Sequence, residues 1–347
     1  MSAELTREAI AAIDPNDSLG DVLAQPHQIG DALWRVEAAG IPRGDFAGGL
    51  VVAGMGGSAI GAELAAAALG DRAVRPVGSV RDYHLPPWTG PETFVLCSSY
   101  SGNTEETLAC FEDATARGIP RAVVTTGGRL AERARAEGVP VIGVPSGMQP
   151  RAAVLYGLIA VLECAAACGA APSLRSELEA MSPVLERLIG EWGPDAPDDS
   201  RAKSLARELS GSVPVFYGAD STVAIAKRWR AQWNENPKLP AFWGELPEAD
   251  HNEVCGWDRA PSLARLRSVF IDDDSIDPRT RRRFGPTARL AEPSTSVSVS
   301  GDSLLERVLS LILLGDLASV YTAALDGVDP STIEAIDRLK AELAAAD

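Results

Sequence analysis

The feature that most constrains the fold is a recurring pattern of a short apolar segment, a turn of small residues and a helix. The pattern is clearest at residues 49–65, 93–111 and 121–137. Regular alternation of strands and helices is typical of a parallel sheet, since a helix must carry the chain back across the sheet between two parallel strands. We therefore predict an α/β fold with helices on both faces of the sheet and with ligands bound beyond the carboxyl ends of the strands.

The same pattern recurs in the second half of the chain, where an apolar strand at 213–217 leads through Gly218 into a helix at 222–233. A length of 347 residues suits two domains, and we interpret the recurrence as an internal duplication. We expect the following parts: an N-terminal helical segment at 1–30, a first domain at 31–170, a linker region at 171–200, and a second domain at 201–347 that contains a polar loop at 234–253 and a C-terminal helix.

The overall charge excludes several classes of partner. A formal charge of −16 opposes binding to nucleic acid or to an acidic membrane surface. No basic segment followed by an apolar run is present near Met1, so a cytoplasmic location is expected. The five cysteines are odd in number and form no Cys-x-x-Cys pair, which argues against a disulfide framework and a structural zinc. We expect neither a metal nor a cofactor.

A hydroxyl-rich turn follows the strand at Thr93–Cys97 and precedes a helix. The start of a helix offers unpaired N–H groups and a positive dipole end, and Ser99, Ser101 and Thr104 add hydroxyl donors, so this turn predicts a phosphate site. The turn lacks the lysine of a nucleotide P-loop, which favours the phosphate monoester of a small molecule. The alternative is that the hydroxyl groups merely cap the helix.

A glycine-rich turn follows the strand at 49–54. The spacing of Gly54 and Gly56 loosely imitates a dinucleotide fingerprint, but no acidic residue stands about 20 positions further on to bind a ribose. Ser58 instead lies where a helix begins, and it supplies another phosphate or hydroxyl donor. The alternative is that the glycines only permit tight packing of strand and helix.

Two further segments carry ionisable residues. A long apolar helix begins at Pro150 and is interrupted by Glu163, which favours burial between lobes or subunits over a membrane span. Arg151 in its first turn is either a cation at the edge of the site or a surface arginine. The loop at 234–253 contains Glu235 and His251, which suit a carboxylate base and an imidazole acid; the alternative is a solvated interdomain loop.

Taken together, these motifs resemble the sugar isomerase (SIS) domain proteins of the phosphoglucose isomerase superfamily, specifically the bifunctional phosphoglucose/phosphomannose isomerase family. The resemblance extends over essentially the whole chain and rests on these motifs: Gly-Met-Gly-Gly-Ser at 54–58, Ser-Tyr-Ser-Gly-Asn-Thr at 99–104, Pro-Arg at 150–151, Asn-Glu-Asn-Pro-Lys at 234–238, Pro-Glu-x-x-His-Asn at 247–252, Gly-Asp-x-x-Ser-Val-Tyr at 315–321 and Leu-Lys at 339–340. It implies two SIS domains, each a three-layer sandwich with a flavodoxin-like strand order.

The resemblance also implies an aldose–ketose isomerase that interconverts glucose 6-phosphate, mannose 6-phosphate and fructose 6-phosphate through a cis-enediol(ate). It implies a phosphate site formed by Gly57, Ser58, Ser99, Ser101 and Thr104. No metal or cofactor takes part in such a reaction.

The remaining roles that the resemblance implies are catalytic. Glu235 would transfer the proton, Arg151 would stabilise the enediolate, and His251 and Lys340 would assist ring opening. The family forms homodimers in which the histidine comes from the partner subunit.

One departure from the family pattern lies beside the histidine. Asp250 stands where asparagine is expected, and its charge would favour the protonated form of the His251 imidazole. Two alternatives therefore stay open: a sugar-phosphate-binding regulator without catalysis, and an isomerase of a different sugar phosphate. A regulator has no use for a base, so the presence of Glu235 favours the enzyme.

Overall fold

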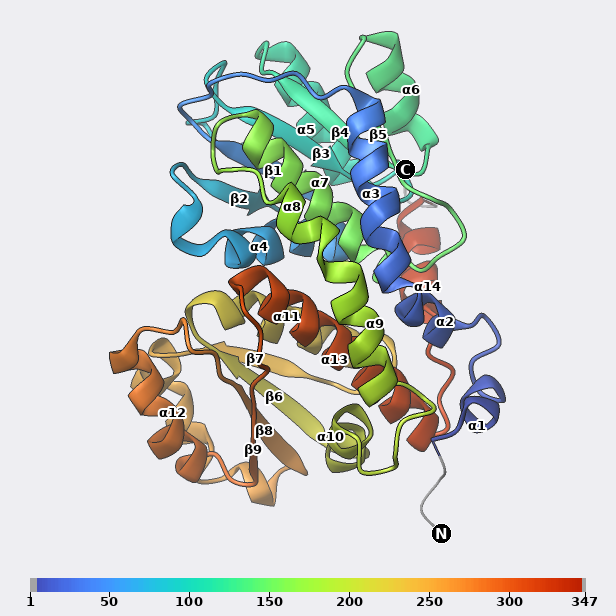
Figure 1. The fold of residues 1–347 in the computed structure, drawn as a ribbon, viewed down its shortest axis with the longest axis vertical. Coiled ribbons are helices and arrows are strands. Elements are labelled where there is room, and N and C mark those ends of the chain that lie inside the picture. The colour runs from blue at the N-terminus through green and yellow to red at the C-terminus, as the bar shows by residue number, and fades with distance from the viewer. Residues whose placement is uncertain (1–4, 345–347) are drawn as a thin grey trace.

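Two parallel β-sheets form the framework of the protein, of which a computed structural model describes residues 5–344 (Figure 1). The first sheet has the order β2-β1-β3-β4-β5 and comprises β1 (Leu50–Gly54), β2 (Val77–Val80), β3 (Phe94–Ser98), β4 (Arg121–Thr125) and β5 (Val141–Gly143). Its central strands β1 and β3 are buried along their whole length. The predicted α/β fold with a flavodoxin-like strand order is thereby confirmed.

Helices cover both faces of the first sheet. On one face lie α3 (Gln25–Ala39), α4 (Gly56–Leu69) and α7 (Val154–Ala167), and on the other lie α5 (Glu105–Ala116) and α6 (Gly128–Ala136). The apolar run at 150–168 is thus mostly helix α7, which packs between α3, α4 and the sheet.

The second sheet repeats this arrangement with the order β7-β6-β8-β9, which matches the order of the first four strands. It comprises β6 (Val213–Gly218), β7 (Phe242–Glu245), β8 (Leu266–Ile271) and β9 (Ser294–Val297), and its helices are α10 (Arg201–Leu209), α11 (Val223–Glu235), α12 (Pro278–Leu290) and α13 (Leu304–Leu325). Helix α12 covers the outer face, whereas α11 and α13 face the first domain. The shared strand order is what an internal duplication predicts.

Helix α13 lies at the centre of the molecule. Its length and composition would allow it to cross a membrane, but 89% of its most apolar 18-residue window is buried inside the protein. It packs against α4, α9 (Met181–Trp192), α10 and α11. One continuous apolar core therefore extends from the first domain through α13 into the second domain.

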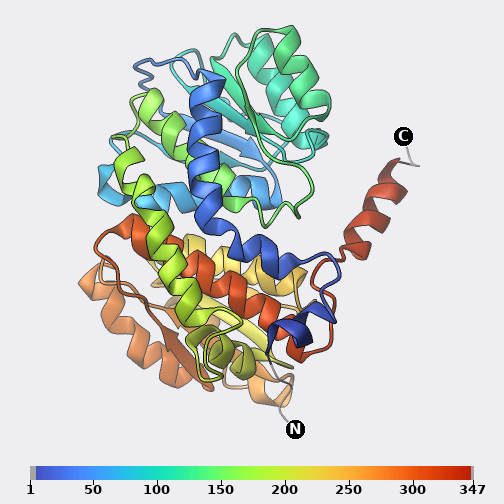
Figure 2. The same ribbon diagram turned by 45° about the vertical axis from the view of Figure 1, so that its right-hand side comes forward.

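The remaining helices lie at the ends of the chain and between the domains: α1 (Arg7–Ala11), α2 (Ser18–Leu23), α8 (Arg175–Glu179), α14 (Glu334–Ala344) and the short 3-10 helices η1 (Gly70–Arg72), η2 (Asp220–Thr222), η3 (Glu248–His251), η4 (Glu253–Gly256) and η5 (Ala260–Ser262). We propose that the domain boundary lies within 171–200, where α8 and α9 connect the two sheets. Helix α14 stands off the body (Figure 2), and it exposes Ile336, Leu339 and Leu343.

Candidate active site

The turns after β1 and β3 meet at the carboxyl edge of the first sheet. The strands pair in parallel with Gly54 opposite Ser98, so the residues that follow them lie side by side. The backbone N–H of Tyr100 donates a hydrogen bond of 3.2 Å to Ser58 Oγ. A Cβ atom on Gly54 would lie 2.7 Å from the carbonyl oxygen of Ser98, which explains why glycine ends β1. The structure thus brings Ser58 together with the hydroxyl-rich turn.

The hydroxyl groups of this turn form a preorganised cradle. Ser99 Oγ lies 2.8 Å from Thr104 Oγ1, and it accepts the N–H of Gly102 at 3.1 Å. Ser101 Oγ accepts the N–H of Asn103 at 3.2 Å. Thr104 precedes α5 without a side-chain hydrogen bond to that helix, so capping does not explain these residues.

Some hydrogen-bond donors of the cradle are available to a ligand. Within residues 5–344, the hydroxyl protons of Ser58 and Ser101 have no acceptor. Helices α4 and α5 both begin here without a side-chain cap, and their first N–H groups point out of the helix end. An anion placed here would meet hydroxyl donors and two positive helix ends.

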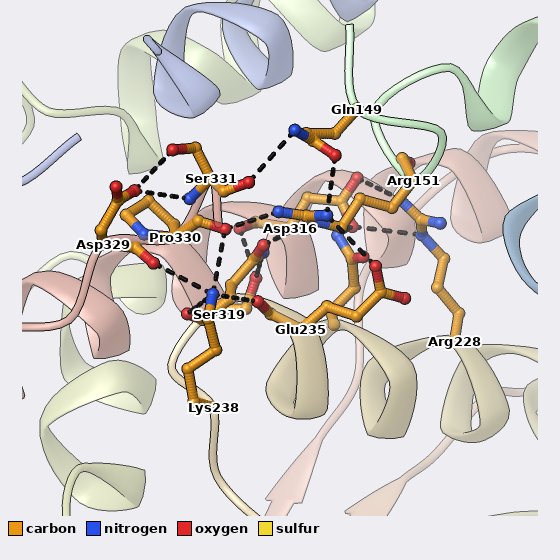
Figure 3. A network of polar contacts seen from close by, with 12 residues as sticks. Gln149, Arg151, Arg228, Glu235, Lys238, Asp316, Ser319, Asp329, Pro330 and Ser331 are labelled. Carbon is orange, nitrogen blue, oxygen red and sulfur yellow. Dashed lines mark hydrogen bonds and ion pairs between the residues drawn. The ribbon is translucent and has the colours of Figure 1, made fainter. Parts of the chain in front are cut away.

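An ion pair between a buried arginine and a partly exposed glutamate, one from each domain, forms the second part of the site (Figure 3). Arg151, at the start of the α7 segment, is 5% exposed, and its Nη1 lies 3.1 Å from Oε2 of Glu235 at the end of α11. Burial lowers the pKa of Arg151, and the Glu235 carboxylate opposes this shift. No hydrogen bond engages Oε1 of Glu235 within the described chain. A carboxylate with one oxygen fixed by an arginine and the other free suits a general base.

A cavity of about 260 Å³ lies at the ion pair, and Gly57, Arg151 and Glu235 contribute to its lining, whereas the hydroxyl residues of the cradle do not. A Cβ atom on Gly57 would lie 3.2 Å from the carbonyl oxygen of Pro150, so the cradle and the ion pair are close neighbours. A larger groove of about 710 Å³ runs along α4 but contains neither Arg151 nor Glu235. The chemistry of the lining, and not the volume, therefore identifies the site.

Several cations in the cavity were not predicted from the sequence: Arg81, Lys227, Arg228 and Arg230. Lys227 lies 2.7 Å from Glu63 and 4.7 Å from the centre of the Trp243 ring. Burial alone would raise the pKa of Glu63, but the hydrogen bond from Lys227 and the charge of Arg81 lower it below its ordinary value. Only four of the 32 basic residues of the chain are lysines, and this scarcity is the one sequence signal that could have pointed to Lys227. These charges make the cavity locally cationic in an acidic protein.

Lys238 follows the Asn-Glu-Asn motif and contacts the backbone at the end of α11. Its Nζ donates to four carbonyl oxygens, those of Glu235, Asn236, Asp329 and Pro330, at 2.6–3.4 Å. The first two carbonyls belong to the end of α11, where the helix dipole favours a cation. Burial lowers the pKa of Lys238 to about 8. Lys238 thus ties α11 to the segment that leads to α14.

The structure does not bring His251 and Lys340 to this pair. His251 is exposed on η3, and Lys340 is exposed on α14. Both oxygens of Asp250 are engaged by α12, at 2.6 Å from Thr287 Oγ1 and 3.1 Å from Arg283 Nη1. Asp250 therefore fastens η3 to α12, and an effect of its charge on the His251 imidazole stays a prediction.

A buried polar network contacts the backbone of Arg151 and so supports the Arg151–Glu235 pair. Arg228 and Asp316 form a salt bridge of 2.7 Å with both side chains almost fully buried. Asp316 also accepts hydrogen bonds of 2.8 Å from Gln25 and Gln232, and Arg228 donates to the carbonyl oxygen of Arg151 at 3.1 Å. Within residues 5–344, no group of three or more His, Cys, Asp or Glu side chains is arranged to hold a metal ion.

Comparison with known proteins is consistent with this geometry. The family described as the bacterial phospho-glucose isomerase C-terminal SIS domain matches residues 198–343. A bifunctional phosphoglucose/phosphomannose isomerase of Caldicellulosiruptor bescii is 38% identical over 302 residues and covers 85% of this chain and 89% of the relative. Its counterpart from Aquifex aeolicus is 37% identical over 300 residues, with coverage of 85% and 90%.

Solved structures agree on the fold. A hypothetical protein of Thermus thermophilus superposes with a TM-score of 0.72 at 17% identity, and the match covers 98% of this chain and 94% of that chain.

Proposed function

Since the chain belongs to the family of bifunctional phosphoglucose/phosphomannose isomerases, we propose that it interconverts glucose 6-phosphate and mannose 6-phosphate with fructose 6-phosphate. The observation that carries this proposal is the Arg151–Glu235 pair, which lies in one cavity with Gly57 at the start of α4. We propose that Gly57, Ser58 and the hydroxyl turn bind the phosphate of the sugar.

The proposed reaction is a proton transfer through a cis-enediolate. Glu235 removes the C2 proton of the open-chain aldose and returns it to C1. At rest, Glu235 neutralises Arg151 across 3.1 Å. When the carboxylate takes up the proton, the guanidinium loses its counter-charge at the moment when negative charge develops on the sugar oxygen. Arg151 therefore stabilises the transition state more than the ground state, which is the condition for catalysis.

The isomerase proposal is tested by turnover of fructose 6-phosphate without added metal, with glucose 6-phosphate and mannose 6-phosphate measured separately. We expect both products in the wild type and a loss of about 10²–10⁴ in kcat for Glu235→Gln, the range for removal of a general base. Glu186→Gln, on the exposed face of α9, is the control and should retain full activity. In D2O, exchange of the proton held by Glu235 with the solvent should place deuterium at C2 of part of the aldose product, whereas an internal hydride shift would leave all of it unlabelled.

We further propose a homodimer in which the partner subunit supplies His251, and we propose that Lys340 reaches the site through a different position of α14. Support comes from the exposure of both side chains and from the detached position of α14 (Figure 2). A cytoplasmic location is also proposed, supported by four buried, unpaired cysteines among the described residues.

Mixing two inactive variants tests the shared site. Glu235→Gln and His251→Ala subunits, unfolded and refolded together, should recover about a quarter of wild-type activity, because half of the dimers are mixed and each has one complete site. If His251 acted within its own subunit, no mixed dimer would be active. Each variant refolded alone is the control.

A further inference from the structure

Arg151 is held by more than its ion pair. Nε donates to Asn236 Oδ1 at 2.7 Å, and Nη2 donates to the carbonyl oxygen of Pro330 at 2.5 Å. Nη1 is shared between Glu235 and, at 3.5 Å, Gln149. Asn236 is 3% exposed, and it is the one partner that contacts the Nε edge within the described chain. This edge sets the rotation of the planar guanidinium about its stem.

The orientation of the Asn236 amide follows from its donors and acceptors. Ser319 Oγ donates its single proton to the carbonyl oxygen of Asp316 at 2.8 Å. Ser319 Oγ must therefore accept the bond of 2.8 Å that joins it to Asn236 Nδ2. With Nδ2 engaged by Ser319, Oδ1 faces the Nε of Arg151. A chain of fixed hydrogen bonds thus runs from α13 through Asn236 to the proposed cation of the reaction.

We infer that Asn236 is a positioning residue, which holds the Arg151 guanidinium at the angle required for the enediolate. The inference rests on the proposed function and adds a role for the third residue of the Asn-Glu-Asn motif. When Glu235 is protonated, its hold on Arg151 weakens, and the short hydrogen bonds to Asn236 Oδ1 and to the carbonyl oxygen of Pro330 keep the guanidinium in place. The effect therefore falls on the transition state more than on sugar binding.

Truncation tests this inference. Asn236→Ala should lower kcat about 10–100-fold, the scale of a small misplacement of a catalytic group, with less than about a threefold change in KM. Ser319→Ala frees the amide to turn, so it should lower kcat to a lesser degree. The double variant should be no worse than Asn236→Ala alone, because both changes break one chain. The control is Asn234→Ala, since Asn234 Oδ1 accepts the N–H of Ala241 at 2.9 Å; its kcat should stay near wild type.

Two ligands separate positioning from a general loss of structure. A phosphorylated aldonohydroxamate carries a planar group like the enediolate, whereas a hexitol 6-phosphate is an open-chain ground-state ligand. Asn236→Ala should weaken the hydroxamate about 10–100-fold and leave the hexitol phosphate within about threefold, in line with selective loss of transition-state binding. Equal weakening of both ligands, or weakening of neither, would overturn the inference.

Failure of the proposed function has a different signature. In that case, the wild type would show no turnover and no preference for the hydroxamate over the hexitol phosphate. If the wild type shows turnover and prefers the hydroxamate, and Asn236→Ala equals the wild type in turnover and in this preference, the proposed role of Asn236 is wrong while the proposed function stands. If Asn236→Ala does not fold, Ser319→Ala with the same two ligands decides the matter.

Discussion

At the scale of single residues, the partners of each charge decide what it does. Arg151 and Asp316 are both almost fully buried. The Asp316 carboxylate is saturated by hydrogen bonds from an arginine and two amides, whereas the Glu235 carboxylate, which pairs with Arg151, keeps one oxygen free. Saturation makes Asp316 a structural ion, and the free oxygen makes Glu235 available for proton transfer.

Asp21 on α2 gives a prediction about pH. Burial, followed by the charges of Asp17 and Asp14, raises the pKa of Asp21 from 3.8 to about 6. The folded protein thus holds this proton more tightly than the unfolded chain, so the contribution of Asp21 to stability is lost as pH rises from about 4 to about 6. Asp21→Asn should raise the urea midpoint of unfolding at about pH 8. At about pH 5 the increase in the midpoint should be smaller. An equal gain at both pH values would contradict this assignment.

At the scale of elements, the crossing of α11 and α13 depends on one glycine. A Cβ atom on Gly315 would lie 2.1 Å from Nε1 of Trp229, whose indole is fully buried and donates to the carbonyl oxygen of Leu311 at 3.0 Å. The two helices approach closely at this point because residue 315 has no side chain.

Substitution of Gly315 sets two effects against each other. Alanine would gain about 0.5–1 kcal/mol of helix propensity, but overpacking of a rigid core costs about 1–3 kcal/mol, so Gly315→Ala should lower the free energy of unfolding. Gly190→Ala is the matched control, because Gly190 lies in α9 and a Cβ there meets no atom within 4 Å. It should stabilise the protein. Urea unfolding measures both, and stabilisation by Gly315→Ala would contradict the proposed contact.

At the scale of the whole molecule, buried polar contacts join segments from both ends of the chain. Gln25 precedes the first sheet, Arg228 belongs to the second domain, and both bind Asp316 on α13. The two domains therefore share one core and one polar network.

Removal of the Asp316 charge tests whether this polar network stabilises the two domains together. Asp316→Asn leaves Arg228 buried without a counter-charge, which should cost about 3–5 kcal/mol of the free energy of unfolding. The control is Asp195→Asn, which breaks an exposed pair with Arg7 and should leave the free energy of unfolding nearly unchanged, because exposed ion pairs contribute little to stability. Equal losses in the two variants would show that the Asp316 network does not join the domains energetically.

The sequence predicted the parts of this molecule that depend on local pattern. Alternation of strands and helices was enough for the α/β class. Residue type made Arg151 and Glu235 candidates, and the family resemblance selected them; the structure pairs the two. The partners that orient Arg151 could not be read from a pattern: Asn236 and Pro330 are 85 and 179 residues away in the chain, and one of these contacts is a backbone carbonyl. His251 and Lys340 are exposed and lie away from this pair, and their part in the site stays a proposal.

The contact between Gln25 and Asp316 also bears on how the protein is made. These residues are 291 positions apart, so a ribosome completes α3 long before it reaches α13. Until then Gln25 lacks its partner, and the second domain emerges with the Arg228 cation still unpaired. A chain released before α13 would expose the apolar face of α11, and exposed apolar surface makes incomplete chains prone to aggregation. Only a chain translated as far as α13 can therefore form the polar network around Asp316.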